Sequence, residues 1–221
     1  AGYATAHVGK WHLGQDRYRA DIPEAGAYGV DFYRTFVSSA RGGNAIKWLA
    51  FNDLAYSNNY TFEEKSATVI FGEATRFIEE HKHEPFYLQV WTRIPHLPID
   101  TTPEQIAAYD DLTNLSPEAF SQSMAEYGSA AEDFDGQLRN YMASMTYLDS
   151  QIGLLLDCLD ANDLSENTII VFSSDNGPER YYIAKASDAG MGYTGESRGG
   201  KRSLYDGGLR VPLIVRWPGR V

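Results

Sequence analysis

The chain has 221 residues, of which 43% are hydrophobic and 22% charged, so it is long enough to bury a sizeable core and is not expected to be disordered. Its formal charge of −11 argues against binding to nucleic acid or to an anionic membrane surface, and no apolar run approaches the roughly 20 residues that a membrane-spanning helix needs. A single cysteine, Cys158, excludes an internal disulfide framework and a cysteine-rich zinc site.

The first predicted strand covers residues 4–8 and leads into the segment GKWHLG at 9–14. Lys10 and His12 are two residues apart, a spacing that places both side chains on one face of an extended chain. A cation beside an imidazole suits an anion site or an acid–base pair. The alternative is an exposed loop lysine and a histidine packed against the intervening tryptophan. His7 lies on the strand itself and is expected to be structural.

Residues 15–59 are rich in glycine, tyrosine and asparagine and are predicted to form long irregular loops over one edge of a sheet. Residues 64–82 have the spacing of an amphipathic helix. Its buried stripe is predicted to contain Ile70, Ala74, Phe77, Ile78 and His81. The histidines at 81 and 83 lie at the solvated end of this helix and are not expected to be ligands.

A strand is predicted at 86–91, and it is followed by His96 between two prolines, Pro95 and Pro98. The prolines fix the backbone, so that the imidazole is presented rigidly at the C-terminal end of a strand, as a functional site requires. The alternative is a packed histidine without a chemical role.

The longest helix is predicted at 137–161, after an acidic stretch at 103–136 that is expected to be solvated rather than to bind metal. One wide apolar stripe follows this helix, and Cys158 falls next to it. The thiol is therefore expected to be an inert core group. The stripe contains Leu138, Tyr141, Met145, Leu148, Ile152, Leu155, Leu156 and Leu159.

A β-branched run at 168–172 predicts a strand buried on both faces, and Asp175 and Asn176 follow at its C-terminal end. In open α/β sheets ligands bind at that edge, and carboxylate and amide oxygens suit Ca²⁺ or Mg²⁺. The alternative is an Asx turn that only ends the strand. A glycine-rich loop then leads to Lys201, whose neighbouring glycines would allow a ligand to approach the backbone closely, and a last buried strand is predicted at 213–217.

The alternation of strands and helices predicts an α/β fold with a mostly parallel sheet and helices on both faces. The candidate residues are expected to lie in loops after strands, apart from the last one, which precedes a strand. They are Lys10, His12, His96, Asp175, Asn176 and Lys201. Two lysines and two histidines beside an Asp–Asn pair describe a site for a small anion next to a divalent cation.

The segments at 2–14, 95–98, 174–177 and 200–212, in this order, resemble the motifs of the formylglycine-dependent sulfatases of the alkaline phosphatase-like superfamily. The resemblance implies hydrolysis of an aryl or carbohydrate sulfate by a formylglycine hydrate that attacks sulfur. It also implies that Asp175 and Asn176 bind Ca²⁺, with Mg²⁺ as the alternative.

The resemblance assigns a role to each remaining candidate. His96 and Lys201 are expected to contact the sulfate and the leaving group, and Lys10 the nucleophile and the sulfate. His12 is expected to be the base that collapses the sulfated hydrate. The Tyr- and Asn-rich segment at 28–60 is expected to contact the sugar or aryl group.

The formylglycine nucleophile of this family arises within a Cys-x-Pro-Ser-Arg pattern that the chain does not contain. Residues 1–221 are therefore expected to be part of a catalytic domain truncated at both ends, without its first strand, its nucleophile and its C-terminal subdomain. The isolated chain is expected to be inactive and poorly stable, because a missing strand exposes apolar sheet edges. A periplasmic or secreted location is the family expectation, and the oligomeric state is not predicted.

Two other functions remain open from the sequence. A phosphatase, phosphodiesterase or phosphonate hydrolase of the same superfamily would share the metal cleft and differ in its nucleophile. The second is a truncated domain that binds a metal or an anion without catalysis.

Overall fold

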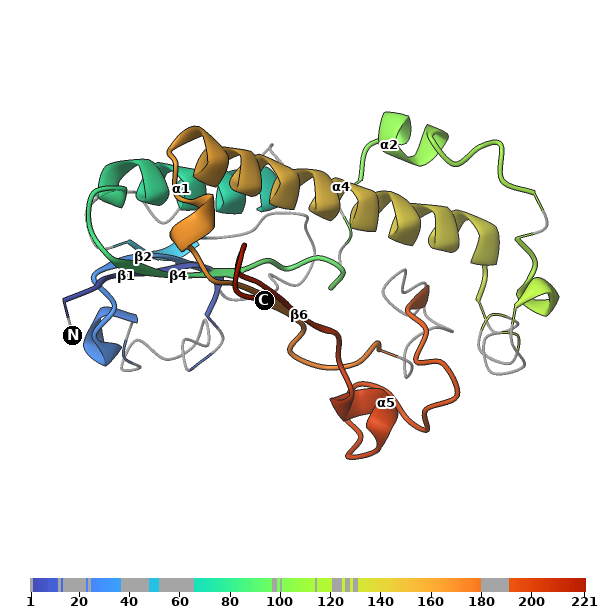
Figure 1. Ribbon diagram of the computed structural model, residues 1–221. Coiled ribbons are helices and arrows are strands. Elements are labelled where there is room, and N and C mark those ends of the chain that lie inside the picture. Colours follow the sequence, from blue (N-terminus) through green and yellow to red (C-terminus); the bar gives the residue numbers. More distant parts are fainter. Residues whose placement is uncertain are drawn as a thin grey trace. The chain divides into compact units, whose positions relative to one another are not determined.

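The computed structural model describes residues 2–11, 13, 23, 25–36, 48–51, 66–96, 99, 101–113, 115–120, 125, 128, 131–179 and 191–221 (Figure 1). The chain divides into two compact units. Unit one contains residues 1–93 and 148–164, and unit two contains residues 94–147 and 165–221. No helix in the described ranges is long and apolar enough to cross a membrane.

Unit one contains a four-stranded sheet in the order β3-β2-β1-β4. Its strands are β1 (Ala4–Lys10), β2 (Phe32–Phe36), β3 (Trp48–Phe51) and β4 (Phe86–Trp91). β1 runs parallel to both of its neighbours, while β3 is antiparallel to β2. The mostly parallel sheet predicted from the sequence is therefore confirmed.

The prediction that residues 15–59 are wholly irregular is wrong, because β2, β3 and the 3-10 turn η1 (Ala25–Tyr28) lie within them. The physical reason is visible in β2, where Arg34 occupies a fully buried position that an apolar residue would normally take. Its guanidinium is neutralised by Glu73, with Arg34 Nε 3.1 Å from the carboxylate oxygen. A charged residue interrupts the apolar pattern of a strand, so the sequence pattern predicted a loop at this position.

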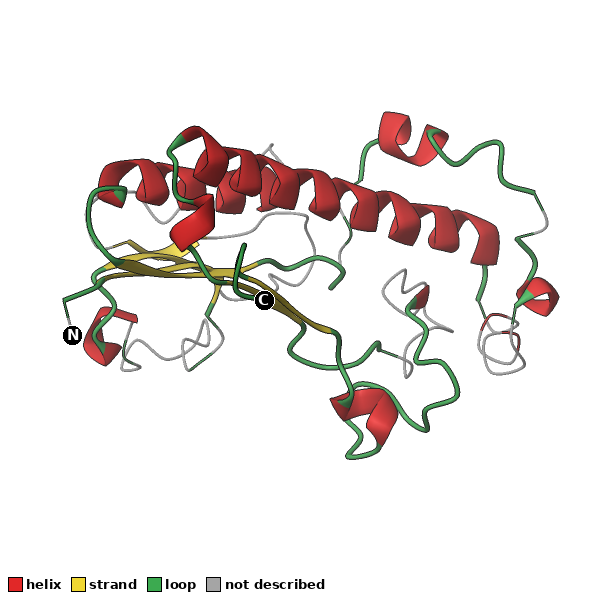
Figure 2. Ribbon diagram, in the orientation of Figure 1, coloured by secondary structure: helices red, strands yellow, loops and turns green. Residues whose placement is uncertain are grey.

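Helix α1 (Ser66–His81) packs on one face of this sheet (Figure 2). The strand register places Ala6, Val8 and Phe32 on that face, and the Phe32 and Phe77 rings lie 5.4 Å apart. The stripe predicted for this helix is confirmed for its four apolar members, which are at most 1% exposed, whereas His81 is half-buried and bonded to Glu84.

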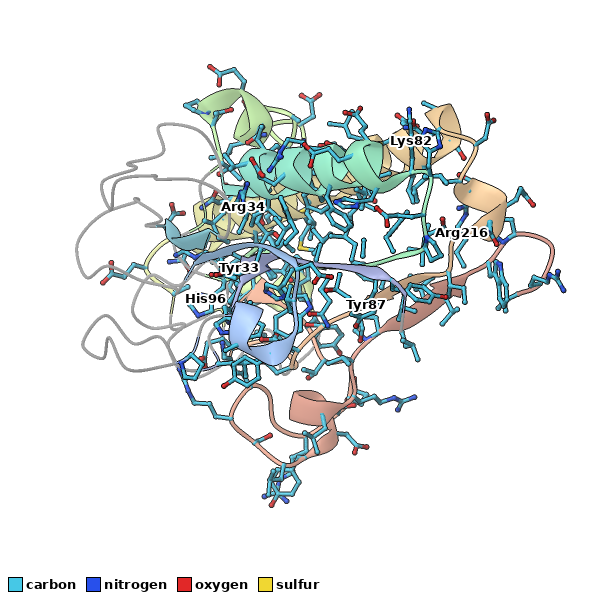
Figure 3. All side chains as sticks on the ribbon, turned by 90° about the vertical axis from the view of Figure 1, so that its left-hand side faces the viewer. Tyr33, Arg34, Lys82, Tyr87, His96 and Arg216 are labelled. Atoms are coloured by element: carbon cyan, nitrogen blue, oxygen red, sulfur yellow. The ribbon has the colours of Figure 1, made fainter. Side chains whose placement is uncertain are left out.

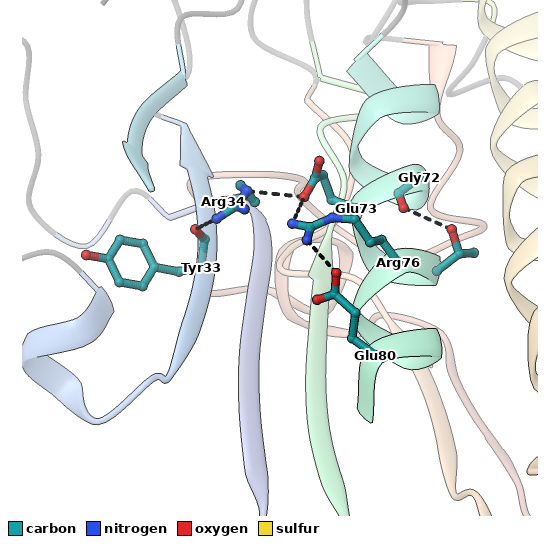
Figure 4. A network of polar contacts seen from close by, with 7 residues as sticks. Tyr33, Arg34, Gly72, Glu73, Arg76 and Glu80 are labelled. Atoms are coloured by element: carbon teal, nitrogen blue, oxygen red, sulfur yellow. Dashed lines mark hydrogen bonds and ion pairs between the residues drawn. The ribbon is translucent and has the colours of Figure 1, made fainter. Parts of the chain in front are cut away.

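A chain of charged groups joins the sheet to α1 (Figure 4). Glu73 accepts from both Arg34 and Arg76, and Arg76 also reaches Glu80 at 2.8 Å. Arg34 donates in addition to the Tyr33 carbonyl. Tyr33 and Arg34 are neighbours on β2, so their side chains leave the sheet on opposite faces, with Arg34 toward α1 (Figure 3).

The opposite face of the sheet is covered near β1 and β2 by a small cluster of Trp11, Ala25 and Tyr33, with η1 supplying the alanine. His7 is fully buried on this face between the rings of Trp11 and Trp91. Its burial agrees with the packed position predicted from its place on the strand.

The longest helix, α4 (Phe134–Ala161), contains the boundary between the two units. Leu138, Leu148 and Leu159 of its predicted stripe are buried. Cys158 is half-buried, and burial raises the pKa of its thiol, as does the nearby charge of Glu79. The thiol is therefore protonated at neutral pH, in agreement with the inert group predicted.

The described residues of unit two also include short helices and a two-stranded antiparallel ribbon of β5 (Ile170–Ser173) and β6 (Leu213–Arg216). The helices are α2 (Pro103–Ala107), η2 (Pro117–Ala119), η3 (Ser165–Asn167) and α5 (Asp206–Leu209). Thr102 forms a capping box with Gln105 at the start of α2.

The positions of β5 and β6 agree with the prediction, but their predicted burial is wrong. Val171 is 62% exposed and Leu213 is 67% exposed. A β-branched run indicates that a strand can be buried on both faces. Whether it is buried depends on other segments that cover those faces, and the sequence of the strand does not specify them. The ribbon of β5 and β6 has such apolar side chains without that cover in the described structure.

Candidate functional site

Asp175 and Asn176 follow the end of β5 after one intervening residue, Ser174, as predicted. The Asp175 side chain is exposed and Asn176 is half-buried. Asn176 Nδ2 donates to the Gly177 carbonyl at 2.8 Å, and Ser174 Oγ donates to the Asn176 carbonyl at 3.0 Å. The bond from Nδ2 orients the side-chain amide, whose acceptor atom is Oδ1. Adjacent residues at the end of the strand therefore supply a carboxylate and an amide oxygen.

The segment after Asn176 is fastened to the loop around α5 through three glycines, Gly177, Gly207 and Gly208, which we call the glycine clamp. Gly177 N donates to the Gly208 carbonyl at 2.9 Å, and Gly207 N donates to the Arg198 carbonyl at 2.8 Å. A Cβ on Gly177 would lie 1.8 Å from the Gly207 oxygen, and one on Gly207 would lie 2.2 Å from the Gly199 oxygen. Only glycine allows this approach of backbones.

Lys201 is held beside the same segment. Its backbone N–H donates to the Pro178 carbonyl at 2.8 Å, and Arg202 forms an ion pair with Glu179. The structure thus brings the Asp175–Asn176 pair and the Lys201 loop together within unit two. The sequence predicted that the glycines near Lys201 would admit a ligand, whereas the close approach observed at the clamp is to the chain itself.

An open groove of about 670 Å³ adjoins the clamp in unit two. It is lined by residues 193–198, 206 and 210–212. The Arg198 guanidinium lies over the Tyr205 ring at 3.9 Å, and Tyr193 is half exposed on the groove wall. Arginine and tyrosine side chains of this kind bind anionic and ring-shaped groups.

Lys10 was predicted to lie in a loop, but it is the last residue of β1. Its side chain is half-buried. Gly9 before it has φ +114°, and a Cβ there would lie 2.1 Å from the Trp91 carbonyl oxygen. His7 supports the same strand end, because its Nε2 is 3.0 Å from the Lys10 carbonyl.

His96 is half-buried and follows a cis peptide bond between Ile94 and Pro95. Its neighbours Leu97 and Pro98 lie outside the described residues, and so does His12. Lys10 belongs to unit one, whereas His96, Asp175 and Lys201 belong to unit two. Most of the segment at 28–60 that was predicted to contact the substrate also lies outside the described residues.

Asp175 and Asn176 are suited to a hard cation because both offer oxygen atoms. Within the described ranges, no group of three or more His, Cys, Asp or Glu residues could hold a metal ion. A calcium ion takes six to eight oxygen ligands. The two residues therefore fit as part of a ligand set that other donors complete.

Sequence reasoning missed the glycine clamp and the Arg198–Tyr205 contact. The signal for the clamp was present in the adjacent glycines at 207 and 208 and in the Gly-Pro step at 177, but nothing in the sequence pairs segments that lie 30 residues apart. The stacked arginine gives no periodic pattern at all.

The family model described as Sulfatase matches residues 1–221. The chain is 30% identical to an ulvan-active sulfatase of Formosa agariphila, over 99% of this chain and 39% of that protein. It is 28% identical to an arylsulfatase of Hemicentrotus pulcherrimus, over 100% of this chain and 37% of that protein. The crystal structure of the PsFucS1 sulfatase from Pseudoalteromonas sp. matches with a TM-score of 0.68 at 21% identity, over 100% of this chain and 43% of that chain. The chain thus spans about two fifths of the length of these relatives.

Proposed function

Because the chain belongs to the sulfatase family, we propose that the intact protein hydrolyses a sulfate ester of an aryl or carbohydrate compound. The observation that carries the proposal is the glycine clamp, which fastens the Asp175–Asn176 pair to the loop of Lys201. Oxygen donors for a cation and an ammonium group for an anion are thereby supplied by one rigid piece of backbone.

The lysines and histidines act on the sulfate group in this proposal. The ammonium of Lys201 offsets the negative charge that grows on the sulfuryl oxygens in the transition state. The hydrogen bond from the Lys201 backbone to the Pro178 carbonyl holds the loop from which this side chain extends. His96 donates a proton to the leaving oxygen. Lys10 contacts the nucleophile and the sulfate, and His12 removes the proton that releases sulfate.

Asp175 and Asn176 would hold Ca²⁺, with Mg²⁺ as the alternative. A bound divalent cation polarises a sulfuryl oxygen and neutralises charge next to the nucleophile. In the sulfatase family the nucleophile is a formylglycine, and we place it in a segment outside these 221 residues. The bond from Asn176 Nδ2 to the Gly177 carbonyl orients the amide and supports its part in the metal site.

The groove beside Arg198 supports a substrate larger than sulfate itself. Its size and its arginine and tyrosine side chains suit a sugar or an aryl ring next to the sulfate. The names of the two relatives, one an arylsulfatase and one active on ulvan, agree with this substrate class.

The test is turnover of 4-nitrophenyl sulfate by the intact protein. Lys201→Ala is expected to lower kcat by about 10²–10³-fold, the usual cost of losing one group that stabilises developing charge. Lys82→Ala is the matched control, because Lys82 is exposed and bonds only Asn162 among the contacts described. Unchanged kcat in the Lys201 variant would contradict its role.

The phosphatase alternative is not favoured, because the family model that matches the whole chain is that of sulfatases. The same assay with 4-nitrophenyl phosphate separates the two. Preference for the phosphate, by the ratio of kcat/KM, would overturn the proposal. If the protein hydrolysed neither of these esters nor a sulfated carbohydrate, the non-catalytic binding domain would be the function that remains.

A further inference from the structure

His7 makes two polar contacts in spite of its full burial in the middle of β1. Its Nε2 lies 3.0 Å from the Lys10 carbonyl, and its Nδ1 lies 3.0 Å from the Gln89 side-chain oxygen. The side-chain nitrogen of Gln89 lies 2.8 Å from the Tyr87 hydroxyl. A chain of three side chains therefore begins at the surface of β4 and ends on the backbone of Lys10.

The partners determine which ring nitrogen carries the proton. A carbonyl oxygen only accepts, so Nε2 carries hydrogen and donates to Lys10. Burial lowers the pKa of His7, and its imidazole is neutral near pH 7, which makes Nδ1 an acceptor. The Gln89 amide therefore donates from its nitrogen to Nδ1 and accepts from the Tyr87 hydroxyl with its oxygen. This assignment exchanges the amide nitrogen and oxygen, which occupy positions of the same shape.

The end of β1 is also fixed by close packing. Gly9 meets the Trp91 backbone with no room for a side chain, and the rings of Trp11 and Trp91 stand edge-on to the imidazole at 4.9 Å and 4.7 Å. The carbonyl that His7 holds belongs to the peptide plane between Lys10 and Trp11. Its orientation therefore sets the direction in which the chain leaves the strand at Trp11.

We propose that His7 is a positioning residue, whose hydrogen bond to the Lys10 carbonyl holds the end of β1 so that the Lys10 side chain is aimed at the sulfate group. The proposal rests on the sulfatase function proposed above. His7 touches neither substrate nor nucleophile and acts only through the peptide plane that it holds.

A purely structural histidine would make a different prediction. If His7 only filled the core, every substitution would lower activity in proportion to the stability it removes. If His7 positions Lys10, the atom that matters is the donor at Nε2, and variants of similar stability must differ in kcat.

Two variants of the intact protein separate these cases. The amide nitrogen of His7→Gln reaches the place of Nε2 and keeps the donor to Lys10, whereas that of His7→Asn reaches only the place of Nδ1. We expect His7→Asn to lower kcat on 4-nitrophenyl sulfate by roughly 10–100-fold with little change in KM, since a small misplacement near the reacting groups has this size of effect. His7→Gln is expected to stay within about threefold of the wild type.

Equal losses of kcat in the two variants at equal thermal stability would overturn the proposal. A measurement on the wild type tests it even if a variant fails to fold: nitrogen NMR of labelled histidine should show His7 as the neutral tautomer with hydrogen on Nε2 at pH 7, and hydrogen on Nδ1 would overturn the proposal. A wild type that hydrolyses no sulfate ester would refute the proposed function instead, and the tautomer would still report on His7.

Discussion

The sheet of unit one and the glycine clamp of unit two are built on opposite principles. In the sheet, buried side chains such as Val8, Ile70 and Phe77 fill the space between strands and helix. In the clamp, backbones touch directly at Gly177 and Gly207, and no side chain lies between them.

The difference shows what each region leaves available for chemistry. A core built from side chains uses those side chains for packing, so a functional residue such as Lys10 is found at the end of a strand. A clamp built from backbone leaves neighbouring side chains outside the contact, and Asp175 is accordingly exposed. Rigid backbone with outward side chains is what a preorganised ionic site needs.

The largest effect should follow from placing a methyl group in the clamp. Gly177→Ala would set a Cβ 1.8 Å from the Gly207 carbonyl oxygen, and backbone on both sides prevents a simple side-chain adjustment. We expect a loss of about 3 kcal/mol or more in stability of this region, at the upper end for overpacking. Hydrogen exchange of peptides 173–178 and 200–210 in the intact protein should rise.

Gly153→Ala is the matched control, since a Cβ at Gly153 in α4 meets nothing within 4 Å. Exchange in the clamp should be the same as in the wild type. If Gly177→Ala also left it unchanged, the clamp would not be the rigid element that we infer.

The parts of the fold that follow a period were predictable from the sequence. The stripe of α1 repeats Ile70, Ala74 and Phe77 at helical spacing, and the strand at Phe86–Trp91 was placed at its observed bounds. Such elements are determined locally, because burial of one face selects the residues along them.

The parts that depend on distant partners were not predictable. Arg34 lies in a buried strand because Glu73, 39 residues away, neutralises it. The clamp joins Gly177 to Gly208, and neither glycine carries information about the other. For the candidate site, the motif order predicted the residues, while the backbone contacts that hold Lys201 beside Pro178 came only from the structure.

The next effect concerns the charge buried in the sheet of unit one. Glu73→Gln removes the carboxylate that faces Arg34, whose side chain is 1% exposed, and leaves a buried guanidinium with a neutral amide. We expect a loss of about 1.5–3 kcal/mol, the range for a hydrogen bond to a charged group. The loss in unfolding free energy is measured by urea unfolding of the intact protein, monitored by hydrogen exchange of peptides from α1.

Glu80→Gln serves as the comparison. Glu80 and Glu73 both form an ion pair with Arg76, but the Glu80 side chain is 48% exposed. An exposed pair of this kind contributes about 0.2–1 kcal/mol. Equal losses in the two variants would mean that burial of Arg34 does not set the energy of the network.

Acid should weaken the sheet of unit one through His7. Burial lowers the pKa of His7 in the folded protein below its ordinary value of 6.5. The unfolded chain therefore takes up a proton that the folded chain does not, and stability that is complete above about pH 6.5 declines as the pH falls below it. His7→Gln should remove this decline, which a pH series of melting temperatures would measure.

Asp31 provides an internal reference for that series. Hydrogen bonds from Thr5 lower the pKa of its carboxyl below 3.8, so its contribution is lost only at still lower pH. A decline near pH 6 that persists in His7→Gln would assign the effect to another group.

The smallest effect should have the opposite sign from the first. Gly72 lies within α1, where a Cβ meets nothing within 4 Å, and its carbonyl accepts from Thr75 through backbone that the substitution leaves in place. Gly72→Ala should therefore stabilise the protein by about 0.5–1 kcal/mol, because alanine loses less conformational entropy than glycine in a helix. We expect the melting temperature to rise for Gly72→Ala and to fall for Gly177→Ala. The same substitution would then stabilise the protein on a helix and destabilise it where two backbones touch. Destabilisation by Gly72→Ala would mean that this face of α1 is covered in the intact protein.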